Sequence, residues 1–161
     1  MSLEIIPGYD RLEEIRELFS EYTDMLLELD PVFGAYLALQ RYDEELQHPE
    51  LKYALPYGRL LIARFDGALA GCIALRRLDE RRCEMKRLYV RDSFRGRGIA
   101  RALVSTLLSE ASAQGYSLML LDTLPALSSA LSLYGSMGFV PVDKYNDSPL
   151  DYTIYLGREL K

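Results

Sequence analysis

Apolar residues in the first part of the chain recur at the spacing of a helix. Intervals of three and four residues alternate through Leu12, Ile15, Phe19, Tyr22, Leu26 and Leu29. This period predicts an amphipathic helix. Asp10 and Glu13 have the spacing of a capping box at its start, and Asp30-Pro31 is expected to end it. A second helical piece is expected to follow, through about Gln47.

Short apolar runs separated by turn residues dominate the rest of the chain. Asp66-Gly67 joins two of these runs and is the strongest hairpin signal in the sequence. Helices are expected from Gly98 to Gly115 and over 126–137. The order, a meander of strands followed by strand–helix–strand units, predicts an α/β (α+β) domain whose mixed sheet has helices on both faces. The expected strands are 3–6, 59–65, 68–76, 83–90, 117–122, 139–142 and 152–158.

A turn rich in arginine and glycine, RGRGIAR, connects the strand 83–90 to the following helix. Unpaired N–H groups at a helix start, together with the helix dipole, attract anions such as phosphate. Gly96 and Gly98 have no side chain, so a phosphate can approach the backbone closely. Arg95, Arg97 and Arg101 add cationic donors. The turn therefore predicts a diphosphate-binding site.

Composition and charge narrow the class of ligand. A chain of 161 residues with 49% hydrophobic and 27% charged residues predicts one globular domain, residues 1–161. The net charge of −5 argues against a nucleic-acid partner. Residues 76–101 hold ten Lys or Arg against four acids, so this segment carries +6 and the remainder −11. The basic segment suits a small polyanionic ligand, or is a solvated charged hairpin away from the helix start. The acidic remainder favours a second ligand that is cationic, such as an amine.

The remaining signals concern location and cysteine chemistry. No apolar run is long enough to span a membrane, and no export signal is recognised, so a cytoplasmic protein without a membrane partner is expected. Cys72 and Cys83 are expected to be reduced and buried; they lie on consecutive strands, which leaves open whether they lie opposite one another. His48 is the only histidine, and no cluster has metal-ligand spacing, so no metal is expected.

Two segments resemble motifs of the GNAT superfamily of N-acetyltransferases. Arg95-x-x-Gly98-x-Ala100, after an apolar strand, is similar to the acyl-CoA signature Q/R-x-x-G-x-G/A. ALSLYGSMGF at 130–139 resembles the helix–Tyr–GF segment of the family. The resemblance covers about the second half of the chain. It implies a GNAT-like, mostly antiparallel sheet of about six or seven strands with a central parallel pair, 83–90 and 117–122, splayed near the helix start.

The resemblance also implies a co-substrate and its binding residues. Acetyl-CoA would place its diphosphate over residues 95–100, and coenzyme A carries three phosphates that suit the basic segment. Its pantetheine would enter between the splayed strands and bond to the backbone of the first. The implied cofactor-binding residues are Leu88, Tyr89, Val90, Arg95, Gly96, Arg97, Gly98, Ile99, Ala100, Arg101 and Tyr134.

The implied reaction is transfer of an acetyl group from acetyl-CoA to a primary amine of a small, cationic acceptor in a direct ternary complex. A backbone N–H near Leu88 would polarise the carbonyl. Tyr134 matches the tyrosine of the family that protonates the leaving thiolate, and Glu84 matches a strand glutamate that removes the amine proton. The alternatives are a core tyrosine, and a glutamate that pairs with neighbouring arginines.

Other functions remain open at this point. An acyl-CoA-binding sensor without catalysis would share the same fold, and a peptide or protein amine is a second class of acceptor. A dinucleotide-binding unit needs a third glycine where this chain has Arg101. The protein is expected to be a monomer or a homodimer. Residues expected around the acceptor are Tyr36, Tyr42, Tyr53, Tyr57, Asp122, Thr123, Tyr145 and Asn146.

Overall fold

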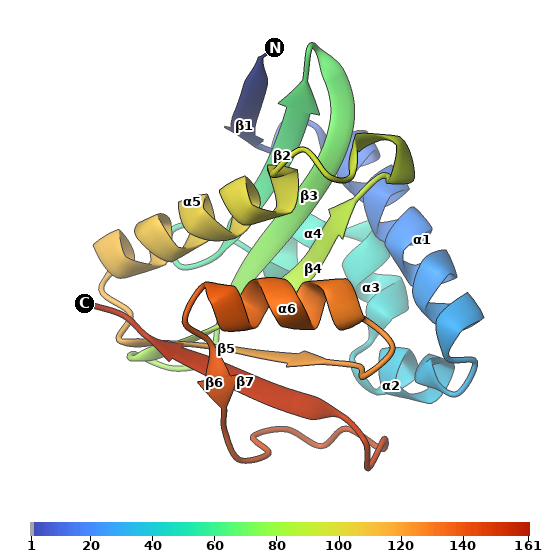
Figure 1. Cartoon of the computed structure of the whole chain (residues 1–161), viewed down its shortest axis with the longest axis vertical. Helices are drawn as coiled ribbons and strands as arrows, with labels where there is room; N and C mark the ends of the chain where they lie inside the picture. The colour runs from blue at the N-terminus through green and yellow to red at the C-terminus, as the bar shows by residue number, and fades with distance from the viewer. Residues whose placement is uncertain (1) are drawn as a thin grey trace.

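The computed structural model describes residues 2–161 and has one seven-stranded sheet (Figure 1). The sheet order is β1-β2-β3-β4-β5-β7-β6, and only the β4–β5 pair is parallel. The strands are β1 (Leu3–Pro7), β2 (Arg59–Phe65), β3 (Ala68–Arg77), β4 (Arg82–Val90), β5 (Leu118–Thr123), β6 (Val140–Pro141) and β7 (Ile154–Glu159). The helices are α1 (Leu12–Leu29), α2 (Phe33–Leu39), α3 (Tyr42–Gln47), α4 (Pro49–Lys52), α5 (Ile99–Gln114) and α6 (Ser128–Ser136), with a 3₁₀ turn η1 at Asp92–Phe94.

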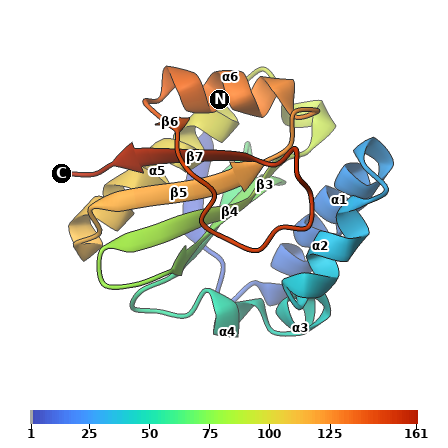
Figure 2. The same ribbon diagram turned by 90° about the horizontal axis from the view of Figure 1, so that it is seen from below.

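Helices cover both faces of the sheet, as the order of elements predicted. α5 and α6 lie on one face, and α1 to α4 lie on the other (Figure 2). Leu103 and Leu107 of α5 are fully buried in the core of the first face, whereas Ile15 and Phe19 of α1 are fully buried in the core of the second. No helix within residues 2–161 is both long and apolar enough to cross a membrane.

The hairpin between β2 and β3 forms where the sequence predicted it. Asp66 and Gly67 both have positive φ, 51° and 81°, and Phe65 pairs with Ala68 across the turn. A two-residue turn of this kind matches the right-handed twist of the strands it joins. Local turn chemistry therefore decided this part of the fold.

Two local predictions were wrong. Arg11, not Asp10, precedes α1, and no side chain within residues 2–161 caps the helix, so the capping box does not form. The helical piece after Asp30 divides into α2 and α3 because Arg41 takes a left-handed conformation, with φ 56°.

The two cysteines are buried and free, as expected. Cys72 pairs with Tyr89 and Cys83 pairs with Arg77, so the two do not lie opposite one another.

The parallel strands separate after three residue pairs. β4 pairs with β5 from Arg82 opposite Leu118 to Glu84 opposite Leu120, and no further pair forms although both strands continue. We call the opening between β4 beyond Glu84 and β5 beyond Leu120 the wedge (Figure 1). The prediction of a parallel pair splayed toward the start of α5 is confirmed.

A bulge in β4 lies at the wedge. Cys72 of β3 pairs with Tyr89, but Ala74 pairs with Lys86, so two residues of β4 lie opposite one residue of β3. Arg87 is one of these two residues, and its φ is 61°. A bulge interrupts the alternation of side chains between the two faces of a strand.

Candidate active site

A large cleft of about 520 Å³ lies between the end of β4, the start of α5, α6 and α1. Every residue predicted to bind the cofactor lines it, with the exception of Arg97. The Arg97 guanidinium instead lies over the ring of Phe65, 5.0 Å from its centroid. The sequence motif and the splayed strands therefore meet at one cavity, although they are separated by η1 along the chain.

The glycines of the turn leave an open cradle at the N-terminus of α5. Gly96 and Gly98 have φ of 76° and 78°, a region that non-glycine residues rarely adopt. Apart from the adjoining residues, a Cβ built on either glycine would meet no atom of residues 2–161 within 4 Å, so it would stand in open space. This space, in front of unpaired helix N–H groups, fits a diphosphate.

Two arginines beside the cradle donate hydrogen bonds to neutral groups. Arg95 Nε donates to the Val90 carbonyl oxygen at 3.2 Å, and Arg101 donates to Ser136 Oγ at 2.8 Å. Both side chains line the large cleft. Arg95 also lies 3.0 Å from the carboxylate of Asp92, which is itself almost fully exposed. The positive charge of the cradle thus remains available to an anionic ligand.

The backbone of β4 at the wedge is open on one side. Leu88, Tyr89 and Val90 pair with β3 or lie at its bulge, whereas the β4–β5 ladder has already ended. In the described part of the chain, backbone groups on the β5 side of these residues therefore have no strand partner. An extended amide chain entering the cleft would find donors and acceptors there, as an added strand does.

Tyr134 of α6 lies in the wall of the large cleft. The residue is 7% exposed, and its ring packs edge-on against Phe139 with centroids 5.8 Å apart. Within residues 2–161 its hydroxyl has no hydrogen-bond partner. Burial raises the pKa of Tyr134 above its ordinary value, so the hydroxyl keeps its proton at neutral pH.

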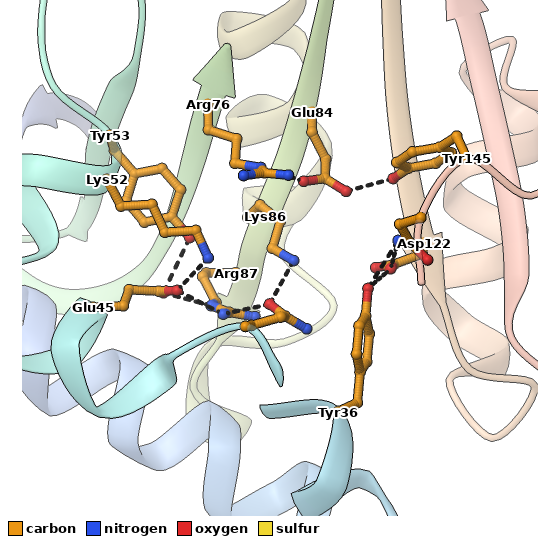
Figure 3. Close-up of polar contacts among 12 residues, drawn as sticks. Tyr36, Glu45, Lys52, Tyr53, Arg76, Glu84, Lys86, Arg87, Asp122 and Tyr145 are labelled. Atoms are coloured by element: carbon orange, nitrogen blue, oxygen red, sulfur yellow. Dashed lines mark hydrogen bonds and ion pairs between the residues drawn. The ribbon is translucent and has the colours of Figure 1, made fainter. Parts of the chain in front are cut away.

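Glu84 lies outside the large cleft. It is 1% exposed and belongs to the part of β4 that still pairs with β5. Arg76 Nε donates to one carboxylate oxygen at 2.7 Å, and the Tyr145 hydroxyl donates to the other at 2.5 Å (Figure 3). Burial by itself raises the pKa of Glu84, but the charges of Lys86 and Arg76 outweigh it and lower the pKa.

A small cavity of about 40 Å³ adjoins the large cleft. The two cavities share Tyr134 and Leu88 among their lining residues. The small cavity also has a polar wall on the side of the sheet that carries α1 to α4. The polar side chains of this wall are Tyr36, Gln40, Lys86, Arg87 and Asp122.

The residues expected around the acceptor separate into two groups. Tyr36, Asp122 and Thr123 line the small cavity, and Asn146 donates to Asp122. Tyr42 and Tyr53 are buried and donate to the Phe19 carbonyl oxygen and to Glu45, so they belong to the packing. Tyr57 is exposed beneath Arg77. Tyr145 bonds to Glu84 and lines neither cavity.

Sequence reasoning did not single out Lys86 or Gln40. Lys86 was counted only as part of the basic segment, yet it is buried in the sheet and lines the small cavity. The available signal was its place two residues after Glu84, on the same face of a strand that is otherwise largely buried.

Comparison with known proteins agrees with this geometry. Residues 12–139 match the model of the Acetyltransferase (GNAT) family. The chain belongs to the GNAT family. An uncharacterized N-acetyltransferase of Schizosaccharomyces pombe is 36% identical over 92% of this chain and 88% of that protein. Human N-acetyltransferase 8 is 48% identical over 38% of this chain and 27% of its own length.

Solved structures share the GNAT fold along the whole chain. A GNAT acetyltransferase of Staphylococcus aureus has a TM-score of 0.77 at 24% identity and covers 99% of this chain and 100% of its own. PaiA N-acetyltransferase of Thermoplasma acidophilum, solved with coenzyme A, has a TM-score of 0.74 at 18% identity, over 99% of both chains. This GNAT protein is an acetyl-CoA-dependent acyltransferase.

Proposed function

We propose that this GNAT protein transfers the acetyl group of acetyl-CoA to the primary amine of a small acceptor, with both substrates bound at once. One observation carries the proposal: the large cleft and the small cavity meet at Tyr134 and Leu88. A thioester reaching the inner end of the cleft would lie beside an amine held in the small cavity. No acetylated enzyme intermediate is needed in such an arrangement.

The residues of the cleft would bind acetyl-CoA through its phosphates and its amide-containing arm. The Gly96–Gly98 cradle and the side chains of Arg95 and Arg101 suit the diphosphate. The open backbone of β4 suits the pantetheine arm. Bound acetyl-CoA supplies an acetyl group on a thioester, whose carbonyl a backbone N–H near Leu88 would polarise.

Tyr134 is the proposed general acid. As the amine nitrogen bonds to the acetyl carbon, the carbon–sulfur bond breaks and the sulfur takes a proton from the Tyr134 hydroxyl. The proton given up by the amine nitrogen balances this transfer, returning to the tyrosine through solvent. A protonated hydroxyl that has no hydrogen-bond partner among residues 2–161 suits this role.

The role of Glu84 as the general base that removes the amine proton stays a prediction. Both of its carboxylate oxygens are bonded, to Arg76 and Tyr145, and its pKa is lowered, which weakens it as a proton acceptor. These contacts favour the alternative, a cross-strand partner of an arginine. Asp122 lines the small cavity beside Tyr134 and is the carboxylate better placed to receive the proton of an amine.

The size of the small cavity favours a small acceptor. One water needs about 10–15 Å³ of such volume, so 40 Å³ holds a few non-hydrogen atoms. A peptide would have to occupy space that side chains fill here. Acetylation of a peptide or protein amine is therefore the second candidate.

An acceptor screen tests this proposal. Release of coenzyme A from acetyl-CoA would be followed with amino acids, polyamines, aminoglycosides and peptides, beside calorimetry of acetyl-CoA binding. We expect binding together with turnover of at least one small amine. Tight binding without turnover of any amine would favour an acyl-CoA sensor, and turnover of peptides alone would favour the second candidate.

A further inference from the structure

Lys86 is a buried cation that no carboxylate contacts directly within residues 2–161. It is 6% exposed, and its ammonium donates to Gln40 Oε1 at 2.7 Å (Figure 3). Within residues 2–161 no carboxylate oxygen lies within 4.0 Å of it, whereas Arg76, Lys52 and Arg87 each have one. Glu84 and Asp122 act on its charge only from beyond this distance, and a buried charge without a direct ion pair is costly. Lys86 lines the small cavity, so a ligand there can supply the contacting anion.

Gln40 does not neutralise this cation. The same Oε1 atom also accepts a hydrogen bond from Arg87 at 2.9 Å, so one neutral amide oxygen serves two cations. Arg87 has Glu45 as its partner, at 2.7 Å, but Glu45 also serves Lys52. The ammonium of Lys86 carries three protons and uses one of them on Gln40.

Asp122 provides the opposite charge on the other strand of the wedge. Its Oδ2 accepts hydrogen bonds from the Tyr36 hydroxyl and from Asn146 Nδ2, the latter at 2.7 Å. Within the described residues Oδ1 has no hydrogen-bond partner, and no cation lies within ion-pair distance. Figure 3 shows the Lys86 and Asp122 side chains entering the same space from β4 and β5.

The two charges do not pair with each other, because they lie more than 4.0 Å apart. An α-amino acid carries an amine and a carboxylate on one carbon, so a single molecule can contact both. A simple amine would leave Lys86 unpaired. In a peptide the terminal carboxylate is separated from the reacting amine by at least one more residue.

Resting on the proposed function, we infer that the acceptor of this enzyme is an α-amino acid, with its carboxylate on Lys86 and its amine on Asp122. The amine then lies beside Tyr134, which borders the same cavity. Leu26, Phe33, Leu124 and Leu127 add apolar surface to the lining, beside Thr123 and Thr153. This surface favours an aliphatic side chain over a charged one, and the volume of about 40 Å³ favours a short one.

The experiment compares acceptors that differ only in the carboxylate. Alanine, alaninamide and ethylamine share one side chain, and kcat/KM would be corrected for the fraction of free amine. Leucine and methionine with their amides and amines form two further sets. We expect each amino acid to be favoured over its amide and its amine by about 100-fold, the usual effect of a hydrogen bond to a charged group.

The variant Lys86→Met keeps the length of the side chain and removes its charge. We expect the KM for alanine to rise about 100-fold, and the preference for alanine over ethylamine to fall toward one. Lys52→Met is the matched control, because Lys52 is a largely buried lysine that lines neither cavity. The control should keep the preference. Thermal unfolding would verify that both variants fold.

Three outcomes would overturn the inference. Equal kcat/KM for amino acids and simple amines would do so, as would a Lys86→Met variant that retains the preference. Turnover of polyamines or peptides, but of no amino acid, would support the acetyltransferase function and contradict an α-amino acid as the acceptor. Calorimetry of amino acids with the protein saturated in coenzyme A gives a second readout, in which binding should weaken in Lys86→Met alone.

Discussion

The two buried side chains proposed for proton transfer differ in how many partners they have. The Tyr134 hydroxyl has none within residues 2–161, and it borders both cavities. The Glu84 carboxylate is held on both oxygens, by Arg76 and Tyr145. A carboxylate held by strong partners gives up that stabilisation when it takes a proton, whereas a hydroxyl without partners among the described residues has its proton available for a hydrogen bond to the substrate. The acid is therefore better supported than the base.

Replacing Tyr134 by phenylalanine isolates the hydroxyl, because the ring and its packing against Phe139 are kept. We expect kcat to fall by about 10²- to 10⁴-fold, the usual contribution of a positioned acid, with acetyl-CoA affinity little changed. Tyr116→Phe is the matched control, since Tyr116 is also buried and donates to the Tyr57 carbonyl oxygen away from both cavities. Steady-state kinetics that gave the same kcat for both variants would assign Tyr134 to packing.

At the scale of elements, α5 has a left-handed glycine at each end with a different role. Gly98 precedes the helix with φ 78°, and Gly115 follows it with φ 102°. A Cβ on either would meet no atom within 4 Å. Gly115 closes the helix, as glycine commonly does. Gly98 lines the large cleft, so its missing side chain matters to a ligand as well as to the backbone.

Valine at these two positions separates the roles. Both Gly98→Val and Gly115→Val should lose about 1–2 kcal/mol of stability, because a left-handed conformation strains any residue with a Cβ. Only Gly98→Val should weaken acetyl-CoA binding, by about 100-fold, since the cradle would be filled and N–H bonds to the diphosphate lost. Calorimetry on the folded variants measures this. An unchanged affinity in Gly98→Val would remove the cradle from the binding site.

Local signals predicted the strands, α5 and the glycine turn, because turn residues and hydrophobic period act over a few neighbours. They did not predict the break at Arg41 or the role of Lys86. The bulge at Arg87 breaks the two-residue period, so Lys86 and Arg87, adjacent in sequence, both reach Gln40. Which strand positions face the cavity depends on that bulge, and the bulge depends on pairing with β3.

At the scale of the whole molecule, a buried ion cluster joins the sheet to the helices on one face. Glu45 of α3 accepts hydrogen bonds from Arg87 of β4, Lys52 of α4 and the Tyr53 hydroxyl, at 2.7 to 3.0 Å. Arg87 is the residue of the bulge. The cluster therefore ties the helices beside the small cavity to the part of β4 that forms the wedge. Its integrity depends on the charge of Glu45.

This dependence makes the stability of the fold sensitive to acid. Burial alone raises the pKa of Glu45, but Arg87 and Lys52 outweigh it and lower the pKa to about 2 from 4.5. A carboxylate whose pKa is lowered by folding stabilises the protein above its unfolded pKa, and this contribution is lost as the pH falls toward 2. Glu45 should thus contribute about 3 kcal/mol to the free energy of unfolding at neutral pH.

Glu45→Gln tests this contribution. The variant should be less stable at pH 7, because Arg87 loses its buried anion, but it should lose about 3 kcal/mol less than the wild type between pH 5 and pH 2. Denaturant unfolding at a series of pH values measures the difference. Glu44→Gln is the control. Glu44 is next to Glu45 in α3, but its side chain is largely exposed, and its only ion pair among the described residues is with Arg41, at 3.8 Å. The free energy of unfolding of the wild type and of Glu45→Gln could instead fall in parallel between pH 5 and pH 2. Other carboxylates, Glu84 among them, would then control acid stability. Packing rather than charge would hold α3 to the wedge.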